Sequence, residues 1–484
     1  MTAFVNRTIA PFALLTALLI LSLLAAGLTQ EYYFLLLPFA ALLFYAGWQH
    51  PYFVFYLLLF SLPFSFEYNF TPSLGTDIPD EGLMLLTTLL FGAYWLYKPA
   101  LINKNVLQHP LTFLLLLHVG WIIITTVGSE QPFLSFKFLL AKSWYVGAFV
   151  MAPFMLFKNK RTLAVSAIIL SVSMLVVTVI ALIRHYSDTF SFSGINEAVA
   201  PFFRNHVNYS SMLVCVIPLF VAFYWLSKKP VAKYWLIAVL LTLLSALFFA
   251  YARGAWLALL TGVIAAGLII KRKMLIGYIA ALTFVIGLLF WLKTSDRYIR
   301  YAHDFKTTIF HEDFKEHLVA TYKLKDVSTA ERFYRWIAGV RMIKEKPLNG
   351  FGPGTFYENY KPYAVPAFKT WVSDNKERST VHNYFLLLLI EQGIPGLFFF
   401  LLLLGAMLYY SQHLYQRTKD IFYRTAALVT GVIIVMIATL NFLSDLIETD
   451  KVGSLFFLCL ATLVMIDVNT RNESKPAADI QRIP

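Results

Sequence analysis

Apolar residues occur along this chain in long runs that are separated by short polar or charged connections. Eleven runs come first, near residues 9–29, 32–48, 52–66, 81–97, 111–128, 133–157, 162–183, 208–227, 233–251, 254–270 and 274–292. Three more follow a long charged segment, near residues 383–411, 421–441 and 452–467. Since a helix needs about 17–25 mostly apolar residues to cross a bilayer, this pattern predicts an all-α, polytopic membrane protein with about 12–14 transmembrane helices.

The long charged segment divides this string of predicted helices. We expect about eleven transmembrane helices in residues 1–292, a large loop at 293–382, three helices at 383–468 and a cytoplasmic tail at 469–484. A connection as long as this loop usually has structure or function of its own. Residues 331–346 are predicted to form an amphipathic helix on or near the membrane. Their apolar positions at helical spacing are Phe333, Trp336, Ile337, Val340 and Ile343.

Composition supports the membrane assignment. Of 484 residues, 59% are hydrophobic and 14% are charged, whereas soluble domains have nearer a quarter of charged residues. The net charge of +13 is explained by basic residues in cytoplasmic connections, so we expect no nucleic-acid partner. Cys215 and Cys459 both lie inside apolar runs, which indicates neither a disulfide framework nor a metal site.

Basic and acidic residues alternate between successive connections. One set of connections is rich in basic residues: Lys98, Lys104, Lys158, Lys160, Arg161, Lys228, Lys229, Lys233, Lys271, Arg272, Lys273, Arg417, Lys419 and Arg424. The other set has acids instead: Glu67, Asp77, Asp80, Glu81, Glu130, Asp445, Glu448 and Asp450. The positive-inside rule then predicts a cytoplasmic N-terminus and an outer position for the 293–382 loop. The run that follows Arg7 has about 20 residues, so we interpret it as a spanning helix rather than a signal peptide.

Three positions have a charged or titratable side chain at the outer end of an apolar run. Arg253 is either an interfacial arginine that reaches lipid headgroups or a clamp for phosphate oxygens. Arg332, with Arg335 beside it, is either a solvated residue of the amphipathic helix or a second phosphate ligand. His382 is either an interfacial histidine or a general base, because imidazole titrates near neutral pH. Glu391 is too far along the predicted helix to be its direct partner.

Four further residues are weaker candidates. Lys137 and Lys142 lie within an apolar run, where a lysine is expected to face a protein interior or a cavity. Arg204 and His206 flank an outer connection. The histidines are dispersed and have no metal-ligand spacing with acids, so no metal site is expected.

Three segments, taken in order, resemble the O-antigen ligase family, which also includes Wzy-type polysaccharide polymerases and bacterial protein O-oligosaccharyltransferases. The segments are Ala252-Arg253-Gly254-Ala255-Trp256, Arg332-Phe333-Tyr334-Arg335-Trp336 continuing to Gly354, and His382-Asn383-Tyr384 continuing to Gly396. The resemblance covers residues from about 200 to 465. It implies a GT-C-like glycosyltransferase architecture in the bacterial inner membrane, with the active site facing the periplasm. The fourteen apolar runs exceed the twelve spans usual in these ligases.

The resemblance implies a specific reaction. A glycan on undecaprenyl diphosphate is attacked at its anomeric carbon by a sugar hydroxyl of the lipid A core, and the lipid diphosphate leaves. The family's functional arginines correspond to Arg253 and Arg332, with Arg335 as a competitor for the second site, and its functional histidine corresponds to His382. No metal and no other cofactor is implied, because the lipid carrier already supplies an activated donor. The expected partners are the lipid-linked glycan, the lipid A-core acceptor and membrane lipid.

Three other functions stay open at this point. A polymerase of the same family would use a second lipid-linked glycan as acceptor, and a protein glycosyltransferase would use a Ser or Thr hydroxyl. A lipid-linked sugar flippase would instead have inverted repeats and charge deep in the bundle. The candidate residues gather at the outer face beside one large loop, which favours chemistry at the outer surface over transport.

Overall fold

The computed structural model of the chain describes residues 2–71, 74–293, 327–365, 373–375 and 378–473. Every one of the fourteen apolar runs forms a helix. Before the loop these are α1 (Thr2–Thr29), α2 (Leu36–Gln49), α3 (Pro51–Ser61), α4 (Asp80–Tyr97), α6 (Pro110–Val127), α7 (Pro132–Val146) with α8 (Ala152–Leu156), α9 (Lys160–Ser187), α11 (His206–Leu226), α12 (Pro230–Phe249), α13 (Arg253–Ile270) and α14 (Met274–Lys293). After it come α18 (Tyr384–Arg417), α19 (Ile421–Leu443) and α20 (Asp450–Glu473).

Among the described residues, ten helical segments are long and apolar enough to cross a membrane. Three further apolar helices are shorter, namely Ala13–Thr29, Pro51–Phe64 and Met274–Leu288. The predicted all-α, polytopic membrane architecture is therefore confirmed.

A short β-hairpin is the exception to this helical architecture, and the sequence pattern did not predict it. Strands β1 (Phe66–Thr71) and β2 (Leu74–Ile78) pair antiparallel between α3 and α4, with Phe66 opposite Ile78. Small helical elements complete the connections: α5 (Lys104–Leu107), α10 (Ile195–Val199), α16 (Val327–Glu345) and α17 (Phe356–Asn359).

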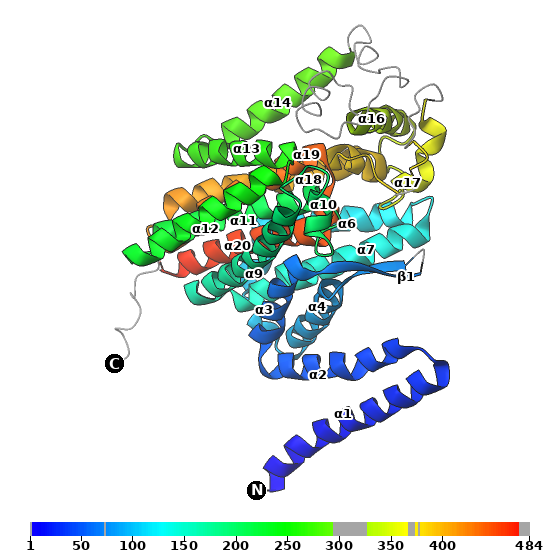
Figure 1. The fold of residues 1–484 in the computed structure, drawn as a ribbon, viewed down its shortest axis with the longest axis vertical. Helices are drawn as coiled ribbons and strands as arrows, with labels where there is room; N and C mark the ends of the chain where they lie inside the picture. Colours follow the sequence, from blue (N-terminus) through cyan, green and yellow to red (C-terminus); the bar gives the residue numbers. More distant parts are fainter. Residues whose placement is uncertain (1, 72–73, 294–326, 366–372, 376–377, 474–484) are drawn as a thin grey trace, which may run out of the picture.

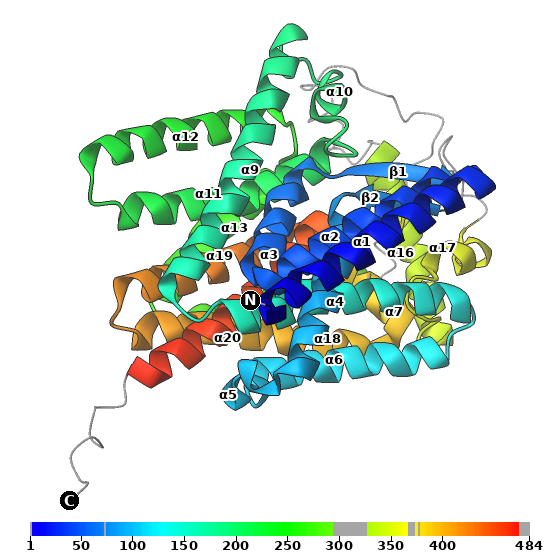
Figure 2. The ribbon, with the colours of Figure 1, turned by 90° about the horizontal axis from the view of Figure 1, so that it is seen from below.

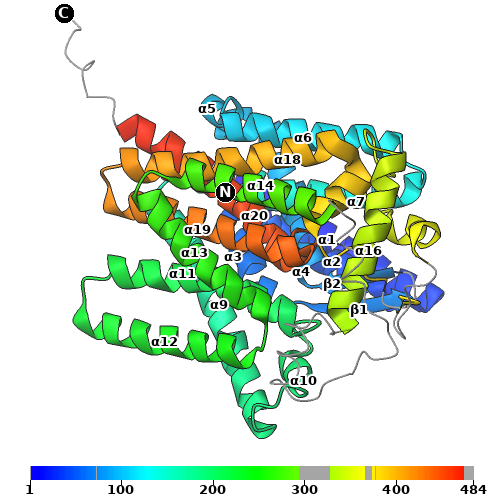
Figure 3. The ribbon, with the colours of Figure 1, turned by 90° about the horizontal axis from the view of Figure 1, so that it is seen from above.

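Helix α19 lies in the middle of the bundle and packs against α13, α18, α11 and α20 (Figures 1 and 3). Its contact with α13 is close because Gly262 lies directly against the side chain of Met436. One polar contact also crosses this interface, where the hydroxyls of Thr261 and Thr439 are 2.8 Å apart. Helices α1 and α2 lie at one edge of the bundle, at the bottom of Figure 1 and in front of the other helices in the view from below (Figure 2).

The two ends of the helical bundle differ in charge, because successive connections are alternately basic and acidic. At one end the basic connections come together, where Arg417 binds the buried carboxylate of Asp467 at 2.7 Å and Lys160 pairs with Asp420. At the other end lie the acidic connections, the β-hairpin and α16. This second end is the one that the charge pattern assigns to the outside.

The C-terminal part of the large loop is joined to α18 through a break in that helix. Gly393 interrupts α18 with a φ of +69°, a left-handed conformation that favours glycine. The backbone carbonyl of Leu348 lies against this glycine, and the Ile394 N–H donates to Pro347 O at 2.8 Å. Phe351 N–H donates likewise to Ile390 O at 3.0 Å. This half of the loop is therefore part of the bundle.

Helix α16 confirms the helix predicted near 331–346, and the face that packs on the protein is not its apolar one. The most buried side chains are Glu331, Tyr334, Arg335, Ala338 and Met342. In contrast, Val340 is 48% exposed, and the rest of the predicted apolar face is only half-buried. The reason is that α16 packs on the N-terminal part of α18 through small residues, with Gly339 directly against Ile390. The apolar side chains of α16 therefore stay partly exposed at the surface of the bundle.

Candidate active site at the C-terminal end of α19

The last turn of α19 and the connection that follows it gather the segments that carry Arg253 and His382. Gly254, the second residue of α13, lies against Leu443 in the last turn of α19. Asn383 donates from its side chain to Phe442 O at 3.0 Å, and the N–H of Tyr384 donates to Ser444 O at 3.0 Å. Arg253 and His382 are the neighbours of Gly254 and Asn383, so both are positioned at this end.

Helix α16 is joined by hydrogen bonds to the segment that precedes His382. Arg335 donates from Nη1 to Thr380 O at 3.1 Å, and the indole of Trp336 donates to Val381 O at 2.9 Å. These two bonds fix α16 to the two residues that precede His382. The structure therefore brings the three predicted segments together.

His382 faces a carboxylate that the sequence did not single out. Its Nδ1 lies 4.0 Å from Oδ1 of Asp445, in the connection between α19 and α20. Thr380 donates from its hydroxyl to Oδ2 of the same carboxylate. The backbone of His382 is left-handed, with a φ of +52°, which is uncommon for a residue other than glycine. This turn points the imidazole out of the helix line that starts at Tyr384.

Burial and two arginines lower the pKa of His382. Partial burial together with the positive charges of Arg332 and Arg335 lowers the pKa of His382 to about 3. Burial also raises the pKa of the Asp445 carboxyl, against the hydrogen bond from Thr380 and the charge of Arg332. The imidazole is therefore neutral at physiological pH, which is the form that accepts a proton.

Arg335 is buried, with 7% of its surface exposed. Its Nη2 lies 3.7 Å from Glu331, one turn earlier on α16, and its Nη1 is used by Thr380. Arg332 is half-buried and acts electrostatically on both His382 and Asp445. Arg335 thus holds α16 in place through its hydrogen bond to Thr380. Arg332 instead acts by its charge on His382 and Asp445.

Arg253 is half-buried at the first position of α13. The preceding residue, Ala252, has no side chain that could cap the helix. The first N–H groups of a helix lack intrahelical acceptors and attract anions. Guanidinium and helix N-terminus therefore favour an anion at the same place.

The weaker candidates have different positions. Lys142 is buried, as predicted, and its Nζ is 2.8 Å from Glu448. Lys137 is exposed, so it does not lie in a packed interior, and its charge acts on Glu81 at the start of α4. His206 is half-buried and its Nδ1 lies 2.9 Å from the side-chain oxygen of Asn196. Arg204 is exposed at the rim of a separate cleft that the α19–α20 connection also lines.

Glu391 anchors the loop. Its carboxylate accepts from the N–H of Gly354 at 2.9 Å and from the N–H of Phe356 at 3.0 Å. Both bonds hold the Gly-rich turn after α16 onto α18. This position agrees with the expectation that Glu391 is not the direct partner of His382.

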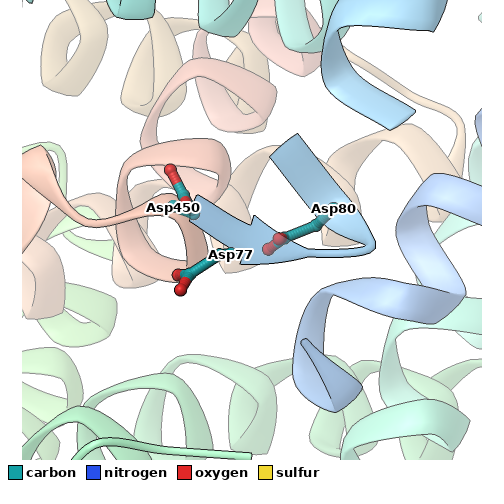
Figure 4. Close-up of side chains that lie close together, drawn as sticks. All are labelled: Asp77, Asp80 and Asp450. Carbon is teal, nitrogen blue, oxygen red and sulfur yellow. The ribbon is translucent and has the colours of Figure 1, made fainter. Parts of the chain in front are cut away.

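Three carboxylates come together beside the candidate site, although their spacing in the sequence did not indicate it. Asp77, Asp80 and Asp450 each offer one oxygen within 4.8 Å of the others (Figure 4). The positive charge of Lys451 acts on all three, and Tyr145 donates a hydrogen bond to Asp450. One lysine faces three carboxylates, so the cluster has an excess of negative charge, and we assign no metal to it.

Asp445 is the site residue that sequence reasoning missed. It was recognised only as one acid of an outer connection. Its proximity to His382 depends on how the α19–α20 connection folds back, and a separation of more than 60 residues carries no local signal. The Asp445-to-Glu448 acid spacing in a short outer connection was the one available hint.

Comparison with known proteins gives two matches. A family model described as O-Antigen ligase matches residues 237–401, a stretch that contains Arg253, Arg332, Arg335 and His382. An O-antigen ligase of Salmonella typhimurium strain LT2 is 28% identical over 222 residues, or 44% of this chain and 49% of that protein. The match thus spans about half the length of this relative. Both findings show a similarity of the chain to O-antigen ligases.

Proposed function

We propose that this chain, which is similar to O-antigen ligases, transfers a glycan from undecaprenyl diphosphate to a sugar hydroxyl of the lipid A core. The reaction would take place at the periplasmic face of the inner membrane, without a metal ion. The observation that carries the proposal is the gathering of Arg253, Arg332 and His382 at the end of α19, with Asp445 opposite the histidine.

His382 is the general base of the proposed reaction. Its Nδ1 faces Asp445, which leaves Nε2 to accept the proton of the acceptor hydroxyl. The hydroxyl oxygen forms a bond to the anomeric carbon while the bond from that carbon to the diphosphate oxygen breaks. The electron pair leaves with the lipid diphosphate, and the imidazolium that forms is stabilised by the Asp445 carboxylate.

Arg253 and Arg332 hold the diphosphate. Negative charge grows on the leaving oxygen in the transition state, and positioned guanidinium groups stabilise it more strongly in a site that excludes water. The first N–H groups of α13 add to this stabilisation.

The charge of the donor also prepares the base. A histidine with a pKa of about 3 is a weak proton acceptor, because an efficient base has a pKa near the working pH. A bound diphosphate offsets the positive charge of Arg332, which is one cause of that low pKa. The pKa of His382 then rises toward its ordinary value, so the base becomes effective when the donor is in place.

The direct test is reconstitution of the full chain with an undecaprenyl-diphosphate glycan and purified lipid A-core. Formation of glycan-bearing core in the presence of EDTA and without nucleotide supports the proposal. If the core lipid stays unmodified while two lipid-linked glycans are joined, the chain is a polymerase and the ligase proposal is wrong.

A further inference from the structure

We infer that the polar cleft beside the β-hairpin binds sugar residues of a substrate glycan, which gives the proposed reaction a carbohydrate subsite. This inference rests on the proposed function. The cleft has a volume of about 630 Å³, within the range of about 300–1,000 Å³ that is usual for small-molecule sites.

The cleft is built from four separate parts of the chain. The β-hairpin contributes Glu67 to one wall, the start of α4 contributes Glu81, and the segment before α11 contributes Arg204 with Asn208 from α11 itself. The connection between α19 and α20 closes the fourth side with residues 448–452. Side chains from distant segments therefore converge on one space.

Lys451 fixes two of these walls to each other. Its ammonium donates to the backbone carbonyl of Ser65 at 2.8 Å and to that of Phe202. It also lies 4.2 Å from the centre of the Phe203 ring. Because its donors are used within the protein, Lys451 shapes the cleft rather than binding a ligand.

The charges that line the cleft indicate the ligand's chemistry. Five lining side chains are acidic and two are basic, namely Glu67, Asp77, Glu81, Glu448 and Asp450 against Arg204 and Lys451. Glu448 is paired with Lys142, so four acids remain against the two basic residues, and this smaller excess of negative charge does not favour a phosphate or diphosphate. Carboxylates accept hydrogen bonds from hydroxyl groups, while Arg204 and Asn208 can donate to them. A ligand rich in neutral hydroxyls fits this lining, and sugars have that character.

The cleft is next to the candidate active site. Asp445, which faces His382, is followed by the short turn Leu446–Glu448 and then by Thr449 and Asp450, which line the cleft. Only Leu446 and Ile447 thus separate Asp445 from Glu448, which lines the cleft. A sugar held in the cleft can extend a neighbouring hydroxyl or glycosidic linkage toward His382.

The test uses binding and kinetics on the full chain in lipid nanodiscs, with and without EDTA. The variant combines Glu67→Ala with Asn208→Ala, two lining residues outside the proposed machinery. Its matched control is Glu197→Ala, an exposed acid of α10 that does not line the cleft. Titration calorimetry measures binding of two probes, soluble core oligosaccharide and the soluble glycan released from the donor.

We expect the double variant to weaken binding of one probe on the order of tenfold, as for two lost hydrogen bonds, and to raise the KM of the matching lipid substrate similarly. If the variant binds the core oligosaccharide more weakly, the cleft binds the acceptor. If it binds the released glycan more weakly, the cleft binds the donor glycan. Unchanged binding and KM for both would overturn the subsite, as would binding that EDTA abolishes. A protein that binds a probe through the cleft but transfers nothing would instead refute the proposed reaction.

Discussion

The imidazole of His382 and the carboxylate of Asp445 face each other at 4.0 Å across two connections that are more than sixty residues apart in the chain. Histidine comes from the turn that enters α18, and aspartate from the turn that leaves α19. Both turns are tied to the last residues of α19 by hydrogen bonds. The pair therefore depends on the packing of two helix ends rather than on a local motif.

Replacement of His382 should remove most of the transfer activity. The suitable change is His382→Asn, since asparagine tolerates the left-handed backbone found there. A positioned general base contributes about 10²–10⁴-fold, so we expect a loss of that size in kcat. Asp445→Asn should lose less, and the double variant should be no worse than His382→Asn alone. His50→Ala, at an exposed histidine of the opposite end, is the control and should retain full turnover; equal losses from both histidines would contradict the role of His382.

The pH profile should separate the free enzyme from the donor complex. Because the pKa of free His382 is lowered to about 3, its neutral form persists down to acidic pH. We expect kcat/KM to stay level from pH 8 to about 5 with no break near the ordinary value of about 6.5. Donor binding raises that pKa, so the acidic limb of kcat should lie at higher pH than that of kcat/KM. Superimposed limbs would show that the diphosphate does not act on His382.

Arg253 should matter for the donor and not for the acceptor. A lost hydrogen bond to a charged group is worth about 1.5–3 kcal/mol, so Arg253→Ala should lower kcat/KM for the lipid-linked glycan by roughly 10–100-fold. Arg253→Lys should restore only part of this, because an ammonium cannot bind two phosphate oxygens in one plane. Arg272→Ala, at the basic end of the bundle, is the comparison. An unchanged donor KM and kcat in Arg253→Ala would exclude the clamp.

The ion pair of buried Lys142 and half-buried Glu448 should contribute to stability. Removing the Glu448 charge leaves the Lys142 charge buried and unpaired, which typically costs about 3–5 kcal/mol. We expect Glu448→Gln to lower the thermal unfolding temperature clearly, and Lys142→Met with Glu448→Gln to recover most of that loss. Thermal unfolding in detergent measures both. A double variant that is as unstable as the single one would show that packing, not charge, is responsible.

Gly393 should not tolerate a side chain. Its φ is +69°, and a Cβ there would lie 2.1 Å from the backbone oxygen of Leu348. Gly393→Ala should therefore lower the unfolding temperature or prevent accumulation of folded protein. Gly267→Ala is the matched control, because that glycine lies within α13 with nothing within 4 Å of the added carbon. Alanine in a helix interior is favoured by up to about 1 kcal/mol over glycine, so the control should be neutral or more stable.

The apolar runs predicted the helices well because a bilayer imposes length and composition directly on the sequence. The same logic predicted α16 as a helix but not the face that packs. Apolar residues mark the face that avoids water, yet α16 uses Gly339 and Ala338 to approach α18 closely, and buries Arg335 beside them. Beside a membrane the apolar face has another apolar partner available, so it need not face the protein.

The candidate site was predicted in part. Arg253, Arg332 and His382 stood out because charge at a helix end is costly near lipid. Asp445 did not, since acids in an outer connection are common. Lys137 and Lys142 had equal claims from the sequence, and only helix packing distinguishes the exposed one from the one that pairs with Glu448. The β-hairpin was missed because its strands are short and lie in a polar connection.

The break in α18 at Gly393 has a consequence for how substrates arrive. Residues 347–356 are joined to α18 on both sides of that break, through backbone bonds and the carboxylate of Glu391. To swing this part of the loop aside, a substrate would have to rupture several of these bonds at once. This part of the loop is therefore held rigidly on α18, so any movement that admits a ligand to His382 has to come from elsewhere in the chain.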